Sequence, residues 1–175
     1  MSADRFWNEP DVEPKRKFRW ILSVGGPGDT AIPAWVIKKV TKPTITISEV
    51  KHSFINHSFY YPGRVEYNEI EFTLVDPGDP DMAQNLLNVI YASGYELPET
   101  YEISKQTITK GEATGTAAIH HMYIQQIDAD ANTIEEWQLV NVWVKEVNFG
   151  DLDYESDDIN EITVKVRYDF ATKSV

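Results

Sequence analysis

The sequence predicts a mainly β protein, a small antiparallel β-barrel or sandwich with one flanking α-helix. Apolar and polar residues alternate along much of the chain, most clearly in Ile162–Phe170, where every second side chain is apolar. This period of two is typical of a strand with one buried face. Only residues 82–94 combine the apolar spacing of a helix with a turn before it and a glycine at its end. Many strands and a single helix define the fold class.

The chain divides into an extended N-terminal arm, residues 1–17, and a single β-rich domain, residues 18–175. The arm contains two prolines and many charges, and its aromatic side chains are Phe6 and Trp7. We expect these two side chains to dock on a neighbouring subunit, because the rest of the arm is polar. With 175 residues, 42% of them hydrophobic, the chain can form a substantial core without cross-links.

The expected strands follow one another along the first half of the domain. The first, Phe18–Val24, ends at the glycine-rich turn 25–29. In the clearest of the next group, Ile70, Phe72 and Leu74 alternate with Glu69, Glu71 and Thr73, which predicts one core face and one polar face. Further strands are predicted over residues 34–40, 43–48, 54–61 and 65–75.

The helix is expected to begin with Asp79 as its N-cap and Pro80 in its first position, and to end at Gly94. Residues 95–116 are weakly patterned and indicate a loop. Residues 117–129 and 133–149 predict a hairpin that leads into the C-terminal strands.

The segment Trp137–Phe170 places two long β-type runs around an acidic turn. That turn, residues 151–158, carries five carboxylates and no basic residue. In the first run, Leu139, Val140, Val142, Trp143 and Val144 put apolar side chains on both faces. A strand that is apolar on both faces needs a second layer, or a neighbouring subunit, on its other side.

The sequence contains none of the patterns that usually carry chemistry. It has no Cys, which excludes disulfides and thiolate sites. His120 and His121 are adjacent and would point to opposite faces of a strand, so they are poor co-ligands for a metal. The acidic turn lacks the spacing of an EF-hand. We therefore expect no catalytic residues, no metal, no cofactor and no enzymatic activity.

The net charge of −12 argues against a protein that grips nucleic acid, which needs clustered cations. The only basic cluster is Lys15–Lys17, with Arg19 nearby. No apolar run approaches the roughly 20 residues of a membrane-spanning helix. The first twenty residues also lack the apolar core of a secretion signal.

The order of these features resembles the tail tube proteins of contractile-tailed bacteriophages. The resemblance rests on the Trp-rich strand, the Phe149–Tyr154 turn (FGDLDY), the acidic loop and the closing strand that ends in Phe170. The strand–helix unit Glu66–Gly94 supports it. The family shares its fold with the hemolysin-coregulated tube protein of type VI secretion.

The resemblance implies a structural protein rather than an enzyme. It implies rings, hexameric in the family, that stack into a tube inside a contractile sheath and form a channel through which DNA leaves the capsid without specific binding. The implied partners are further copies of the chain, the tail sheath protein, and baseplate and tail terminator proteins. The implied location is the virion tail, after assembly in the host cytoplasm.

Two sets of residues follow as candidate sites of such a tube. Glu69, Glu71 and Thr73 are candidates to face the lumen. The candidates for contacts within or between rings are Phe6, Trp7, Phe54, Phe59, Tyr60, Leu139, Val142 and Trp143.

Other readings of the sequence remain open. The chain could be a baseplate protein that initiates the tube, or the tube of a secretion system. It could also be an unrelated monomeric β-barrel that binds a small ligand.

Overall fold

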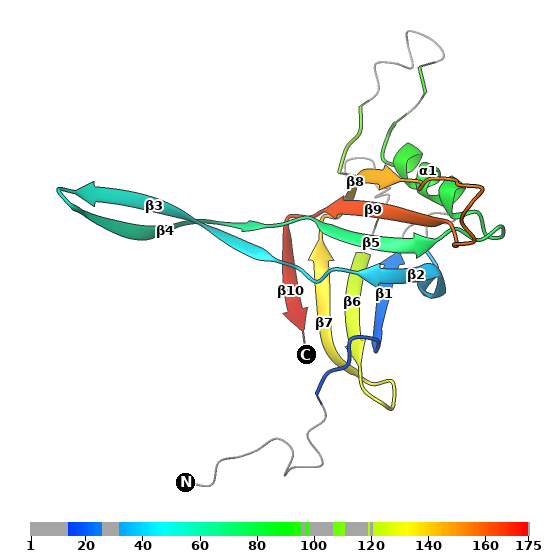
Figure 1. Cartoon of the computed structure of the whole chain (residues 1–175), viewed down its shortest axis with the longest axis horizontal. Coiled ribbons are helices and arrows are strands. Elements are labelled where there is room, and N and C mark those ends of the chain that lie inside the picture. The colour runs from blue at the N-terminus through cyan, green and yellow to red at the C-terminus, as the bar shows by residue number, and fades with distance from the viewer. Residues whose placement is uncertain are drawn as a thin grey trace.

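The described part of the chain forms two antiparallel four-stranded sheets, a separate two-stranded ribbon and one α-helix (Figure 1). The computed structural model describes residues 14–25, 32–95, 97–98, 107–110, 119 and 121–174. Sheet A has the order β1 (Trp20–Gly25), β6 (His121–Ile127), β7 (Thr133–Val140), β10 (Phe170–Ser174). Sheet B has the order β2 (Ile37–Val40), β5 (Ile70–Val75), β9 (Glu161–Arg167), β8 (Trp143–Asn148). The ribbon consists of β3 (Ile45–Phe54) and β4 (His57–Tyr67).

The core lies between the inner faces of the two sheets. Sheet A buries Leu22, Met122 and Ile124, and Sheet B buries alternate residues of β5 and β9, including Phe72 and Val164. The helix α1 (Met82–Ala92) covers part of this core and buries Met82, Leu86 and Val89. The expected mainly β class with one flanking helix is confirmed. The two sheets form an open sandwich rather than a closed barrel.

Two long runs that the alternation presented as single strands pass from one sheet to the other. Val140 ends β7 in Sheet A, Asn141 adopts a positive φ of 57°, and Trp143 begins β8 in Sheet B. In the same way β9 belongs to Sheet B and β10 to Sheet A, with a break at Tyr168 and Asp169. The expected doubly buried strand over Leu139–Val144 is therefore wrong, because its two apolar faces belong to two different sheets.

These two crossovers are joined to each other. The side-chain amide Nδ2 of Asn141 donates to Asp169 Oδ2 at 2.8 Å, and the backbone N–H of Asp169 donates to the Val140 carbonyl at 3.0 Å. Lys110 binds the other carboxylate oxygen, and its hydrogen bond, together with that of Asn141, lowers the pKa of Asp169. These polar contacts hold together the two points at which the chain crosses from one sheet to the other.

Local boundaries differ from the expectations in three places. The helix begins two residues later than predicted: its N-cap is Asp81, whose Oδ1 accepts the Gln84 N–H at 2.9 Å, rather than Asp79. Residues 34–36 form a short 3-10 helix before β2. Residues 65–75 are split between β4 and β5, because Asn68 turns back to the Thr44 carbonyl.

The end of the helix is as expected. Gly94 follows the last helical turn with a positive φ of 100°, a conformation that suits glycine. Most of the loop expected over residues 95–116 lies outside the described residues, as do Phe6 and Trp7.

The expected strand over residues 54–61 is instead the far end of a hairpin. β3 and β4 are joined by a two-residue turn at Ile55 and Asn56, and β4 continues through Pro62 and Gly63, where a strand end was expected. The ribbon projects away from both sheets as a long arm (Figure 1).

Candidate assembly surfaces

Among the described residues, the ribbon carries the longest run of exposed apolar side chains. Every residue of β3 is exposed, and almost every residue of β4. A two-stranded ribbon on its own is marginally stable in water, because neither face is covered. The ribbon therefore has the properties of a segment whose exposed faces are covered by a partner. Its large exposed apolar side chains are Ile45, Ile47, Val50, Phe54, Ile55, Phe59, Tyr60, Tyr61 and Val65.

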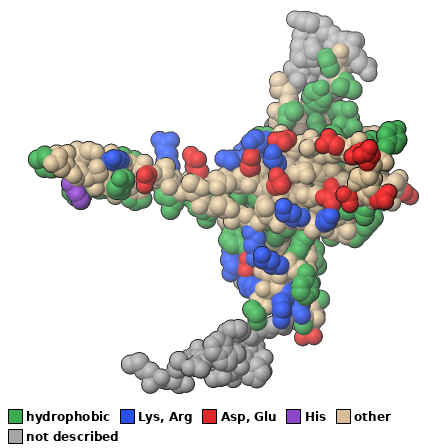
Figure 2. All heavy atoms as spheres, in the orientation of Figure 1, with side chains coloured by type: hydrophobic (Ala, Val, Ile, Leu, Met, Phe, Trp, Pro, Cys, Tyr) green, Lys and Arg blue, Asp and Glu red, His purple; other side chains and the backbone are tan. Residues whose placement is uncertain are grey.

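The apolar residues of the ribbon form cross-strand pairs in both of its halves. Near the base, Ile47 lies opposite Val65, and beyond the register shift Val50 lies opposite Tyr61. The shift moves the apolar positions of β3 from odd to even residue numbers. Figure 1 shows the two strands crossing between base and tip, so the ribbon also twists there. In Figure 2 hydrophobic side chains lie at the tip and along the lower margin of the ribbon.

The register shift depends on a glycine. A Cβ at Gly63 would lie 2.3 Å from the Ser48 hydroxyl and 3.0 Å from the Ser48 carbonyl oxygen. The same hydroxyl accepts the Arg64 N–H at 2.8 Å. The close approach of Gly63 and Ser48 therefore fixes the position of the register shift, beyond which the apolar residues of β3 have even instead of odd numbers.

The tip of the ribbon holds an unusual residue. Ile55 occupies the first position of the turn with a φ of +52°, and its side chain is 84% exposed. A β-branched residue is strained in this conformation, which glycine or asparagine adopts more easily. An exposed, strained isoleucine suggests that the side chain contributes to a contact outside the protomer.

A buried ion-pair site lies on Sheet A, where the N-terminal arm and the segment that leads into the ribbon approach it. Glu135 is buried on β7; Lys42 donates to its Oε1 at 2.7 Å, and Trp137 Nε1 donates to the same oxygen at 2.6 Å. Lys15, at the start of the described chain, binds the other carboxylate oxygen. The hydrogen bonds from Lys15 and then Lys42 outweigh the desolvation that opposes them and lower the Glu135 pKa to about 2.

Glu135 is not among the site residues predicted from the sequence. A carboxylate shares the inward face of β7 with Trp137 and Leu139, and this break in an apolar alternation is the signal that was available. Its two lysine partners are far from it in the sequence, at positions 15 and 42, so their approach could not be read from spacing.

The candidate lumen residues lie at the polar face of Sheet B. Glu71 and Thr73 are on β5, and Glu69 immediately precedes it. Glu69 pairs with Lys145, and this hydrogen bond lowers the Glu69 pKa. Thr73 is only 9% exposed.

The polar face of Sheet B carries cations as well as the carboxylates Glu69 and Glu71. Lys165, directly opposite Glu71 in the register, donates to both carboxylate oxygens of Glu146 at 3.0 and 3.1 Å. Carboxylates and cations alternate on this face rather than forming an acidic wall. Figure 2 shows blue and red side chains intermixed over the body of the protein.

The candidate interface residues have different surroundings. Phe54, Phe59 and Tyr60 are exposed on the ribbon. Leu139 and Val142 are 3% and 5% exposed and belong to the core of the protomer, so their side chains have no surface to offer a neighbour. Their place among the contact residues is corrected for that reason. Trp143 is partly buried at the start of β8.

The acidic turn forms an exposed loop between β8 and β9. Leu152 and Tyr154 project from it into solvent. Across the described part of the chain, no three His, Asp or Glu side chains come together as they would around a metal ion. No helix within the described ranges is long and apolar enough to cross a membrane.

Solved structures of contractile injection systems contain chains with this fold. A chain of the sheath–tube complex of an extracellular contractile injection system (PVC, extended state) aligns with a TM-score of 0.65 and 16% identity, over 94% of this chain and 94% of that chain. A chain of the six-fold symmetrised baseplate of the anti-feeding prophage aligns with a TM-score of 0.65 and 12% identity, over 93% and 97%.

A chain of the tube-terminating cap structure of the anti-feeding prophage gives a TM-score of 0.66 and 13% identity, over 94% of this chain and 93% of that chain. Neither a model of a known protein family nor a curated protein sequence matches this chain. At these identities the likeness is one of fold. The protein has the fold of chains in contractile injection assemblies, which agrees with the tail-tube fold expected from its sequence.

Proposed function

We propose that the protein is the repeating subunit of the inner tube of a contractile tail, and that it is structural rather than catalytic. The observation that carries this proposal is the ribbon, a long apolar arm that no other part of the described protomer covers. A repeating assembly supplies the missing cover, because each subunit then receives the ribbon of another. The occurrence of the fold in a sheath–tube complex supports the proposal.

The open sandwich offers a route to ring closure. Sheet A ends at β1 and β10, and Sheet B ends at β2 and β8. Edge strands carry unpaired backbone groups that favour pairing with another chain. Repeated head-to-tail contacts close into a ring, and a second set of contacts that does not close produces a stack. Six copies per ring is the number we propose, in keeping with the six-fold symmetry of the anti-feeding prophage baseplate.

In this tube the ribbon makes the contacts between rings, through Phe54, Phe59 and Tyr60, and the N-terminal arm contributes Phe6 and Trp7. The polar face of Sheet B, with Glu69, Glu71 and Thr73, lines the channel. In a contractile phage the channel conducts DNA, the tube lies in the virion tail inside the sheath protein, and baseplate and terminator proteins bind its two ends.

A second form of the same function is the tube of an extracellular injection system, whose cargo is not a genome. The origin of the structural neighbours favours this form. Particles purified with the tube separate the two, because only a phage particle carries packaged DNA that leaves through the tail. A tube-initiating baseplate protein would instead be present in a single ring per particle.

The experiment that tests the proposal is electron microscopy of the purified protein with size-exclusion chromatography. We expect rings, and at higher concentration stacked tubes with a central channel. A species of 20.0 kDa that stays monomeric at high micromolar concentration would contradict the proposal and favour a ligand-binding monomer.

A further inference from the structure

A basic groove lies at the open seam between the two sheets of this acidic protein. Seven of the 16 Lys and Arg residues fall between positions 15 and 42, although the whole chain has a net charge of −12. Two cavities of about 520 and 450 Å³ adjoin each other there and share Lys17, Trp20 and Lys38. They lie between β1 and β2, the edge strands of Sheet A and Sheet B.

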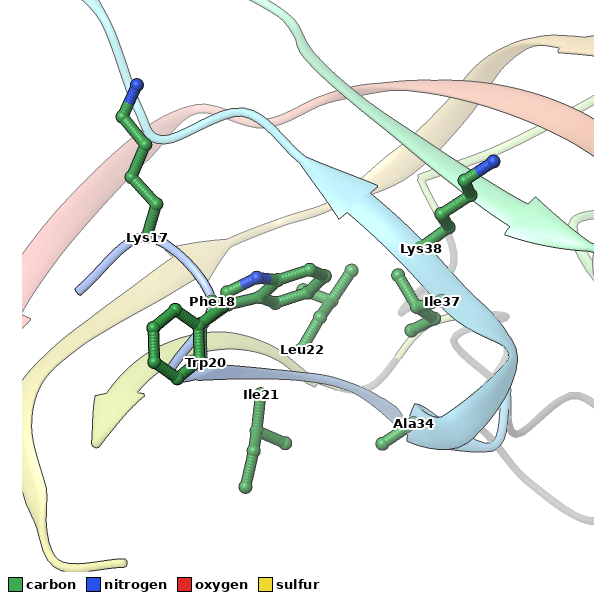
Figure 3. Close-up of a pocket in the computed structure, with 8 residues that line it drawn as sticks. All are labelled: Lys17, Phe18, Trp20, Ile21, Leu22, Ala34, Ile37 and Lys38. Carbon is green, nitrogen blue, oxygen red and sulfur yellow. The ribbon is translucent and has the colours of Figure 1, made fainter. Parts of the chain in front are cut away.

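The groove is apolar inside and cationic at its rim. Phe18, Trp20 and Ile37 line its first cavity (Figure 3). In Figure 3 the amino groups of Lys17 and Lys38 stand at the two ends of this apolar lining. Lys39 and Lys42 line the second cavity. Such a groove suits an acidic segment that also carries aromatic side chains.

Part of the rim is already neutralised within the protomer. Lys38 pairs with Glu161, and Lys42 with Glu135. Lys17 and Lys39 have no ion-pair partner among the residues that the structure describes. Phe18 beside them is 75% exposed. Two cations and an exposed aromatic ring are therefore available to a partner.

The chain itself contains a segment of complementary chemistry. Residues 1–13 include four carboxylates and one arginine around the aromatic pair Phe6 and Trp7. We propose that this acidic, aromatic segment of one copy docks in the groove between β1 and β2 of a second copy. The inference rests on the proposed function as a homopolymer and names the surface that receives the arm.

The start of the arm is fastened to Sheet A beside the groove. Pro14 lines a cavity beside the β6–β7 turn, at Asp128 and Asp130. Lys15 binds Glu135, and Gln126 Nε2 donates to the Arg16 carbonyl at 3.1 Å. These contacts hold the described part of the arm, from Pro14 onward, along the end of Sheet A.

Cross-linking between differently labelled copies tests the proposal, since the native chain has no Cys. Asn8→Cys places a thiol next to Trp7, and Ile21→Cys places one at the groove while keeping every lysine. We expect a short bismaleimide to join the two single variants into a dimer when they are mixed under tube-forming conditions. A matched control, Lys173→Cys on β10 at the other edge of Sheet A, should give no dimer with Asn8→Cys.

The possible outcomes separate this inference from the proposed function. Tubes without the Asn8–Ile21 dimer would overturn the docking of the arm while the tube function stands. A cross-link that forms only within the double variant would mean that each arm covers its own groove, and would also overturn it. Absence of rings and tubes in the native protein would defeat both.

Charge reversal supplies an independent measurement. Lys17→Glu with Lys39→Glu should raise the protein concentration needed for tube formation about tenfold, equivalent to about 1.4 kcal/mol per subunit. Adding Glu9→Lys and Asp11→Lys to the same chain should restore assembly. If the groove variant forms tubes normally but loses binding to duplex DNA, the groove is a polyanion site and the proposal is wrong.

Discussion

Glu135 is a buried carboxylate that connects three segments of the chain. Lys15 belongs to the N-terminal arm, Lys42 to the link before the ribbon, and Trp137 to the same strand as Glu135. A buried charge is tolerated when charged hydrogen-bond donors surround it. The residue therefore sets the positions from which both projecting segments leave the body.

Replacing Glu135 by Gln should lower the free energy of unfolding by about 2 kcal/mol at pH 7, because two charge-assisted hydrogen bonds are lost. The folded pKa of about 2 lies below the ordinary value of 4.5, so the stabilisation is complete above pH 4.5 and declines as the pH falls toward 2. Chemical denaturation of both proteins across this range measures it. A difference between them that does not shrink on acidification would contradict this assignment.

Ile55 offers a test of contact against backbone strain. Ile55→Gly should leave the stability of the protomer unchanged or raise it by up to about 1 kcal/mol, because glycine accepts the φ of +52° without strain. The same change should weaken stacking, since it removes the apolar tip of the ribbon. Thermal unfolding and tube formation, measured on the same preparation, check both effects. Ile55→Asn, which also relieves the strain and removes the apolar side chain, should behave in the same way, and unchanged stacking in both variants would show that the tip makes no contact.

At the scale of elements, the alternation of apolar residues identified the strands but not the sheets to which they belong. The runs around Asn141 and Asp169 keep an unbroken apolar pattern while the backbone crosses from one sheet to the other. A period of two reports a buried face and carries no information on which sheet covers it. The ribbon was missed for a related reason: its pairs, such as Ile47 with Val65, resemble those of a half-buried hairpin.

The helix and the central strands were predictable because their signals are local. The stripe of Met82, Leu86 and Val89 and the alternation in β5 and β9 place the same residues in the core as the structure does. The candidate surfaces were predictable only in part. Phe54, Phe59 and Tyr60 are exposed as a contact role requires, whereas the Glu135 site joins residues too far apart in the sequence for any local pattern.

Removal of the ribbon tests its role as an element. Deleting residues 49–62 and closing the shortened hairpin with Asn-Gly should leave the unfolding temperature of the body nearly unchanged, because β3 and the distal part of β4 bury no core residue. The variant should form no tubes. Circular dichroism and electron microscopy measure the two properties. Normal tubes from this variant would exclude the ribbon from the contacts between rings.

At the scale of the whole molecule, negative charge is distributed unevenly. The loop between β8 and β9 is acidic, the seam between β1 and β2 is basic, and the polar face of Sheet B carries ion pairs such as Glu69 with Lys145. A wall of matched charges neither attracts nor strongly repels a polyanion. In the proposed channel, passage of DNA would depend on the carboxylates that keep the cations occupied.

Glu69→Lys with Glu71→Lys should therefore change the channel more than the fold. The variant removes the carboxylate partner of Lys145 and the carboxylates that face Lys165 and Arg167, and it leaves Lys165 paired only with Glu146, so each ring gains a cluster of cations. Fields of this kind act over about 8 Å at physiological salt, and cationic contacts add affinity for phosphates. We expect tubes to assemble but to retain DNA, with slower genome delivery by a phage that carries the variant.

Glu155→Lys with Asp157→Lys makes the same charge change in the acidic loop and should not affect delivery. Equal delivery by both variants and the native phage would place Glu69 and Glu71 outside the channel.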